Sequence, residues 1–141
     1  MNSSQLSSAA LAYLGDSVIE ICVRKHLVSC GYSHSSELNR LALDFVRAPV
    51  QAEAVKRILS LLSEDESAVF RRGRNIGHTS VPKNATPSQY RAATGMEALF
   101  GYLFLEGKSD RIDQLFNEAY AEQISLSKER IIQKNGNKNQ I

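Results

Sequence analysis

The stretch Thr86–Glu106, TPSQYRAATGMEALFGYLFLE, has the pattern of one long helix with an apolar body. Thr86 is suited to the N-cap, Pro87 to the first helical position, and Gln89 to the far half of a capping box. Glu97 is the one charged residue in the apolar part of this helix. Burying an ionised carboxylate costs several kcal/mol unless something compensates it, so we expect Glu97 to have a partner.

A second stretch, AYLGDSVIEI, holds Asp16 in similarly apolar company. Apolar residues recur around it at three- and four-residue spacing, which predicts a helix over about 7–29. Gly15 precedes Asp16, and Gly101 shares a helical face with Glu97. Small neighbours therefore leave room for a close approach at both carboxylates.

The residues alone leave the partner of each carboxylate open between an arginine, backbone or hydroxyl donors, water, and a metal ion. Neither stretch contains histidine or cysteine. Oxygen ligands suit a hard cation such as Mg²⁺ better than zinc. Two acidic residues far apart in the sequence have no motif specificity by themselves, so carboxylates satisfied by arginine or water are the alternative.

The rest of the chain predicts more helices and few strands. Alternating runs of Val, Ile, Thr and aromatic residues are few, while glycine and proline recur at intervals suited to helices. We therefore expect an all-α fold of six to seven helices, the others lying over about 33–45, 49–62, 63–75 and from 109 onward. Residues 76–86 are expected to form an exposed loop.

The length of 141 residues fits one domain. We expect this domain to cover residues 1–126, because the apolar period is lost after that point, and residues 127–141 to form a polar, disordered tail. No apolar run is long enough to cross a bilayer, and the N-terminus lacks the pattern of an export signal. These features predict a cytoplasmic protein with no membrane partner, in which Cys22 and Cys30 are reduced and structural.

Charge is distributed unevenly along the chain. No acidic residue occurs between Glu66 and Glu97, and this segment carries Arg71, Arg72, Arg74, Lys83 and Arg91. The segment is a candidate anion-binding surface. The alternatives are a solvated face without carboxylates and, for the three arginines, a favourable interaction with the C-terminal end of a helix dipole.

Three motifs in order resemble those of the ribonuclease III family. LAYLGDSVIE at Leu11–Glu20 resembles its signature helix, RRGRN at Arg71–Asn75 its Gly-Arg turn, and GMEALFGYLFLEG at Gly95–Gly107 its late helix with a Glu-Ala-Leu-x-Gly motif. With VPKNATPSQYR between the last two, the order and spacing are similar to the compact Mini-III branch, which lacks an appended double-stranded-RNA-binding domain.

The resemblance implies a ribonuclease III catalytic-domain-like helical fold that forms a homodimer and cuts both strands of an RNA duplex, leaving 5′-phosphate and 3′-hydroxyl ends. Asp16 and Glu97 fall on the catalytic metal-binding positions, with Mg²⁺ as the cofactor and Mn²⁺ as a substitute. Tyr13 falls where the family places an aromatic that packs into the partner subunit, the alternative being an ordinary core aromatic. The implied substrate is a 23S ribosomal RNA precursor.

The sequence also departs from the longer ribonucleases III. Ala9, Ala12 and Thr94 stand where those proteins carry acidic residues, a thinning shared by the Mini-III branch. Fewer protein ligands imply more waters on the metal, and therefore weak metal binding that tightens when RNA is present. Glu20 is expected to pair with Arg24 at i, i+4, with a metal role as the alternative.

Double-stranded RNA is recognised mainly through its shape, phosphates and 2′-hydroxyls, which requires polar and positive groups spread over a surface. The acid-free segment fits this need, and we expect the duplex to contact Arg71, Arg72, Arg74, Asn75, Lys83, Asn84 and Arg91. Two other classes of function compete with the endoribonuclease. One is a catalytically silent RNA-binding or ribosome-associated protein with the same fold, and the other is a purely helical interaction module.

Overall fold

The computed structural model describes residues 3–76 and 83–138, and all regular structure among them is helical. This confirms the all-α prediction. Seven α-helices and two short 3₁₀ helices follow in the order η1 (Ser3–Gln5), α1 (Ser8–Cys30), α2 (Ser35–Val46), α3 (Ala48–Ile58), η2 (Leu59–Leu61), α4 (Glu64–Arg74), α5 (Pro87–Leu105), α6 (Ser109–Ala119) and α7 (Ala121–Lys138). Of the loop expected over 76–86, residues 77–82 lie outside the described part.

The helix ends form as the local sequence dictates. The Thr86 hydroxyl accepts a hydrogen bond from the Gln89 backbone N–H at 3.1 Å, and the Thr86 N–H donates to Gln89 Oε1 at 3.0 Å. Ser63 and Glu66 make the same reciprocal pair at the start of α4. Gly31, in the left-handed region with φ 103°, caps α1. The third helix was expected to reach about residue 62, but α3 ends at Ile58 and the chain tightens into η2.

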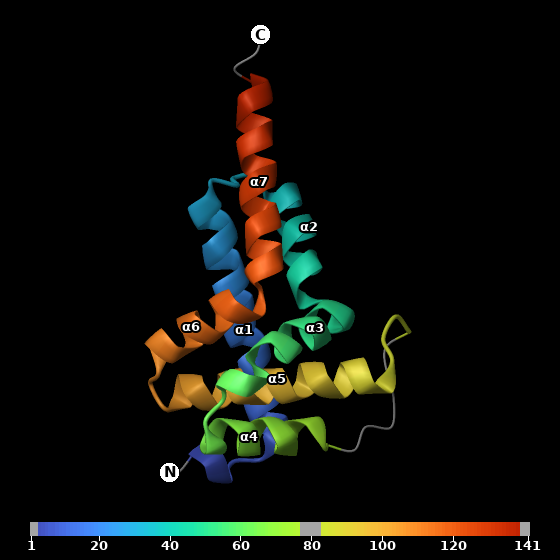
Figure 1. The fold of residues 1–141 in the computed structure, drawn as a ribbon, viewed down its shortest axis with the longest axis vertical. Coiled ribbons are helices and arrows are strands. Elements are labelled where there is room, and N and C mark those ends of the chain that lie inside the picture. The colour runs from blue at the N-terminus through green and yellow to red at the C-terminus, as the bar shows by residue number, and fades with distance from the viewer. Residues whose placement is uncertain (1–2, 77–82, 139–141) are drawn as a thin grey trace.

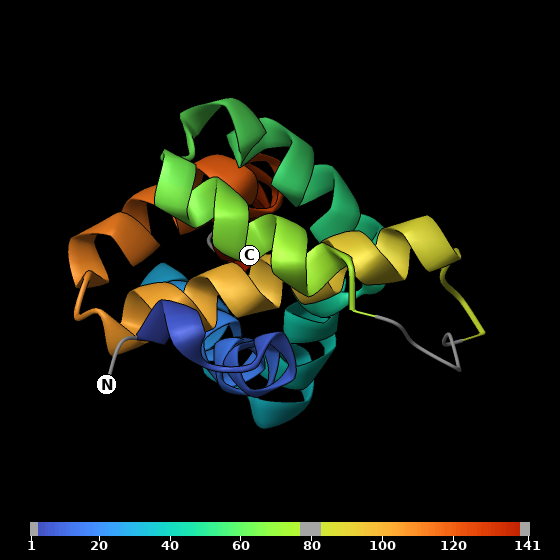
Figure 2. The same ribbon diagram turned by 90° about the horizontal axis from the view of Figure 1, so that it is seen from below.

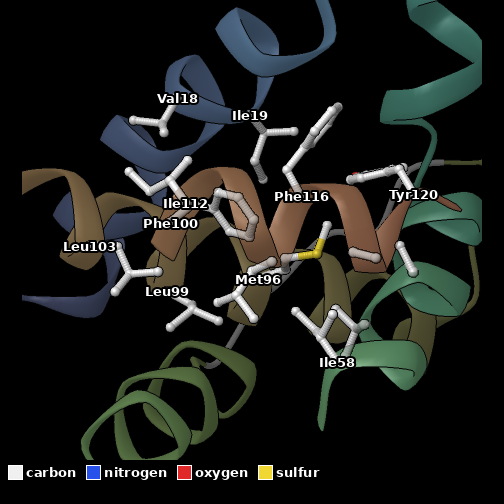
Figure 3. Packing of buried hydrophobic residues seen from close by; sticks show 14 of the residues in the cluster. Val18, Ile19, Ile58, Met96, Leu99, Phe100, Leu103, Ile112, Phe116 and Tyr120 are labelled. Atoms are coloured by element: carbon white, nitrogen blue, oxygen red, sulfur yellow. The ribbon is translucent and has the colours of Figure 1, made fainter. Parts of the chain in front are cut away.

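Helix α5 is the central element. In Figures 1 and 2 it crosses the body of the molecule, with α1 on one side and α4, α3 and α6 on others. Half of its residues are buried, and they include four large side chains that are wholly inaccessible to solvent. Figure 3 shows how these meet the other helices in the core, which contains Val18, Ile19, Ile58, Met96, Leu99, Phe100, Leu103, Ile112, Phe116 and Tyr120. The site described below is built on this helix.

Helix α7 corrects the expectation of a disordered tail. The polar segment after residue 126 was expected to be disordered, yet α7 continues to Lys138 and rises away from the body in Figure 1. Ser127 is buried, with its Oγ 2.7 Å from His26 Nε2 and its carbonyl accepting from the Tyr32 hydroxyl at 2.6 Å. Lys134 Nζ lies 3.0 Å from Glu37 Oε1. These polar contacts add to the packing of Ile124 and Ile131 against the core, and together they hold a helix whose sequence has few apolar residues. Residues 139–141 lie outside the described part.

No helix of the described residues is long and apolar enough to span a membrane.

Candidate active site

Helices α1 and α5 cross in backbone contact, and two glycines make this possible. A Cβ added at Gly15 would lie 1.6 Å from the carbonyl oxygen of Glu97, and one at Gly101 would lie 2.1 Å from that of Leu11. Any side chain at either position would force the helices apart. Because Asp16 directly follows Gly15, the crossing brings it beside Glu97.

The two predicted carboxyl groups meet at this crossing. Asp16 lies on the solvent side, and Glu97 is more enclosed. Burial raises the pKa of Glu97 to about 8, and the neighbouring Asp16 carboxyl adds to the rise through a hydrogen bond and through its charge. Without a cation, Glu97 is therefore mostly protonated at neutral pH. No arginine or other positively charged side chain of the described residues contributes to the shifted pKa of Glu97.

The donor set at the crossing fits a hard divalent cation with few protein ligands. A cation would offset both causes of the raised pKa of Glu97, its burial and the nearby carboxyl. Within residues 3–76 and 83–138, no group of three or more His, Cys, Asp or Glu side chains could hold a metal. Thr94, three residues before Glu97, adds no acidic group, and its hydroxyl donates to the Tyr90 carbonyl at 3.0 Å. Among the described residues, Asp16 and Glu97 are thus the acidic ligands available at the crossing. Mg²⁺ suits two protein ligands because it keeps several waters and also binds substrate oxygens.

A cavity of about 710 Å³ adjoins Glu97. It is bounded by the α2–α3 junction, by α3 and by the start of α5, and its lining includes Arg47, Gln51, Asn84, Tyr90 and Glu97. Gln51 is only 4% exposed. The sequence did not point to Arg47 and Gln51, because only the packing of α3 against α5 brings them to the cavity that Glu97 also lines.

The expected RNA-contacting residues lie at one end of the molecule. Figure 2 shows the end of α4 and the start of α5 at the same end. A Cβ at Gly73 would lie 2.8 Å from Ala98 Cβ, so this glycine lets the end of α4 sit close against α5. The Arg74 guanidinium lies 5.8 Å from the centre of the Phe70 ring, a cation–π distance. The seven expected residues are all exposed: Arg71, Arg72, Arg74, Asn75, Lys83, Asn84 and Arg91.

The outer face of α1 carries three large exposed apolar side chains among polar and charged ones. Tyr13 is 85% exposed, so the alternative of a core aromatic is wrong. Ile21 and Val28 on the same helix are 63% and 62% exposed. Glu20 on the same helix pairs with Arg24 at 2.9 Å, as the i, i+4 spacing predicted.

Comparison with known proteins identifies the class to which this fold and site belong. The family described as the ribonuclease III domain matches residues 9–108, a span that contains Asp16 and Glu97. The chain therefore belongs to the ribonuclease III family.

The relatives narrow this to one branch. The chain is 42% identical to the Mini-ribonuclease 3 of Symbiobacterium thermophilum, over 84% of this chain and 91% of that protein. It is 41% identical to the Mini-ribonuclease 3 of Enterococcus faecalis, over 80% of this chain and 87% of that protein. A crystal structure of a protein from Fusobacterium nucleatum matches with a TM-score of 0.73 at 31% identity, covering 80% of this chain and 90% of that one. Within the family, this chain falls in the Mini-ribonuclease 3 branch.

Proposed function

We propose that Asp16 and Glu97 together hold the Mg²⁺ ion with which this endoribonuclease cleaves double-stranded RNA. The observation that carries the proposal is the meeting of two carboxyl groups, one enclosed and one open to solvent, at a backbone contact that only glycine permits. Membership of the ribonuclease III family supports the reaction, hydrolysis of a phosphodiester to give 5′-phosphate and 3′-hydroxyl ends. Mn²⁺ is expected to substitute.

The two carboxyl groups have different tasks because their surroundings differ. Glu97 sits deeper and gives up its proton when the cation is bound, since carboxylate ligands are deprotonated. Asp16 faces solvent, where the phosphate of an approaching duplex can reach the same position. Mg²⁺ held there would activate a water for in-line attack and offset the charge on the phosphate oxygens. The rigid crossing of α1 and α5 keeps both carboxylates in place for this step.

The duplex would lie along the basic end formed by α4 and α5. Charged and polar side chains spread over this end match a ligand that is recognised through shape and phosphates. The cavity beside Glu97 continues this surface, since Asn84 lines it. Because contacts to phosphates are electrostatic, affinity should depend strongly on salt.

A homodimer would bring two such sites to the two strands of one duplex. The side of α1 that exposes Tyr13, Ile21 and Val28 is the surface we assign to the contact. Large exposed apolar patches on soluble proteins mark interaction sites. We further propose that the biological substrate is a 23S ribosomal RNA precursor and that the protein acts in the cytoplasm.

The test is cleavage of an end-labelled RNA duplex, with Mg²⁺ and with a chelator. The chain should cut only with Mg²⁺, and Asp16→Asn and Glu97→Gln should lose activity while keeping the helical circular-dichroism spectrum. Asp110→Asn, an exposed carboxylate in the first turn of α6, is the matched control and should cut like the parent. Near-native cutting by either site variant would refute the assignment, and duplex binding without cutting by the parent would indicate a silent RNA-binding protein.

A further inference from the structure

The cavity that Glu97 lines extends beyond the carboxylate pair to the junction of α2 and α3, which lies beside the first half of α5 (Figure 1). Its volume of about 710 Å³ falls in the range typical of sites that bury a small ligand. This space suits a sugar and a phosphate of one strand and is too small for a whole duplex. The cavity is therefore a candidate for holding one nucleotide of a bound strand.

Gln51 is a polar side chain buried at the wall of this cavity. It lies on α3 and is only 4% exposed. Within residues 3–76 and 83–138, its side-chain amide makes no hydrogen bond of ordinary geometry. A buried amide without partners costs free energy unless a ligand or a water completes its hydrogen bonds. The amide both donates and accepts, and so does a ribose 2′-hydroxyl, which makes the two groups suitable partners.

Arg47 lies at the edge of the same cavity, one turn before Gln51. It is the single residue between α2 and α3, and its carbonyl accepts from the Gln51 backbone N–H at 2.9 Å. The i, i+4 spacing places both side chains on one side of α3. The Arg47 guanidinium lies 3.8 Å from Asp44, which Arg130 also approaches at 3.7 Å. Exposed ion pairs of this kind are weak, so a phosphate can compete with Asp44 for the guanidinium.

The rest of the lining suits a sugar joined to that phosphate. Small apolar residues such as Pro49 and Ala93 form part of the wall and can pack against the carbon atoms of a ribose. Asn84, an exposed residue just before α5, adds a second amide. A free anion would need only the arginine, whereas amides and apolar walls beside it match a ribose and its phosphate together.

We infer that this cavity holds the ribose and phosphate of the nucleotide next to the cut, that Gln51 hydrogen-bonds its 2′-hydroxyl and that Arg47 binds its phosphate. The inference rests on the proposed cleavage at Asp16 and Glu97, because Glu97 lines the same cavity. It makes Gln51 a determinant of specificity for RNA over DNA, since the 2′-hydroxyl is the group that distinguishes the two at a given position.

Single 2′-deoxy substitutions in the RNA test the role of Gln51. Each duplex carries one deoxynucleotide in the cut strand, at a different position around the mapped cut, and kcat/KM is measured with Mg²⁺ for the parent and for Gln51→Met. Methionine has a similar size but no amide. We expect one substitution beside the cut to slow the parent about tenfold, as the loss of one hydrogen bond does, and to slow Gln51→Met less than about twofold.

The matched control is Gln123→Met, because Gln123 lines a different cavity of about 280 Å³ between α2, α3 and α7. This variant should respond to the deoxynucleotide as the parent does. A deoxynucleotide that only altered the shape of the duplex would slow the parent and Gln51→Met alike, and that result would overturn the inference. The absence of a sensitive position beside the cut in the parent would overturn it too, even if Gln51→Met failed to fold.

Arg47→Gln tests the phosphate contact, and Arg40→Gln, which changes an exposed arginine on α2, is its control. Binding of the all-RNA duplex is measured in a chelator over a range of salt concentrations. We expect Arg47→Gln to reduce the slope of log affinity against log salt by about 0.9 and Arg40→Gln to leave it unchanged. An unchanged slope for Arg47→Gln would remove Arg47 from the site.

The failure of the inference and that of the proposed function give different results. If the parent cuts the duplex with Mg²⁺ but shows neither the deoxynucleotide effect nor the change in slope, the inference fails and the proposed function stands. If the parent cuts no duplex with Mg²⁺, both fail.

Discussion

The glycine contact between α1 and α5 gives the strongest mutational prediction. In Gly15→Ala the new Cβ would lie 1.6 Å from the Glu97 carbonyl oxygen, whereas ordinary contact begins near 3.4 Å, so the helices must separate by about 1.8 Å. The atom it meets is backbone and cannot turn away. Overpacking of this kind typically costs about 1–3 kcal/mol, and occasionally more. The better helix propensity of alanine returns about 1 kcal/mol, so we expect a net loss of up to about 2 kcal/mol.

The effect on cleavage should be larger than the effect on folding. A misplacement of about 1 Å at a catalytic group can cost about 10²-fold in rate, and here the shift falls on the carboxylate pair itself. We expect Gly15→Ala to cut duplex RNA at least a hundredfold more slowly under conditions where urea titration shows it folded. Gly136→Ala is the control, because a Cβ there meets nothing within 4 Å. A Gly15→Ala protein with parental stability and cleavage would refute the reasoning.

Four further predictions follow from the site and its frame. Glu97, with its pKa near 8, must lose a proton to bind the cation. The Mg²⁺ concentration for half-maximal cleavage should therefore fall as pH rises from 6 to 8, and a concentration that does not change with pH would contradict this. Arg111→Met should lower the free energy of unfolding by about 3 kcal/mol at pH 7, since Arg111 holds the buried Glu66 at 2.8 Å. The pairing depresses the pKa of Glu66 below 4.5. In urea titrations, the difference in free energy of unfolding between the parent and Arg111→Met should therefore be complete above about pH 4.5 and vanish on further acidification. A difference that stays constant with pH would exclude this cause. Arg71→Gln should reduce the slope of log affinity against log salt by about 0.9 if Arg71 binds one phosphate, and an unchanged slope would remove it from the interface. Tyr13→Glu should shift sedimentation from dimer to monomer, whereas a persistent dimer would place the contact elsewhere.

The proposed site pair, Asp16 and Glu97, could be picked out from the sequence because its evidence is local. A carboxylate in an apolar helix needs a partner, and the motifs around Asp16 and Glu97 supply family context. Their proximity could not be computed from spacing, since it depends on the close approach at Gly15 and Gly101.

The parts that the sequence did not predict depend on tertiary packing. Gln51 looks like an ordinary polar residue on an amphipathic helix, and only the packing of α3 on α5 buries it beside Glu97. Ile21 fits the apolar period of α1 but faces outward, because that long helix is apolar on more than one side. Helix α7 has few apolar residues and thus a weak periodic signal. Ile124 and Ile131 still pack against the core, and the buried Ser127 with its partners His26 and Tyr32 adds polar contacts.

Locating the metal tests the central claim most directly. Crystals of the chain with an RNA duplex or its cleaved product, grown with Mn²⁺ at a pH of about 8 so that Glu97 can ionise, would show the ion by its anomalous scattering. The account predicts a peak in direct bonding distance of carboxylate oxygens from both Asp16 and Glu97, with the remaining positions taken by waters and a phosphate oxygen. An ion bound to the duplex with neither carboxylate in contact would contradict it.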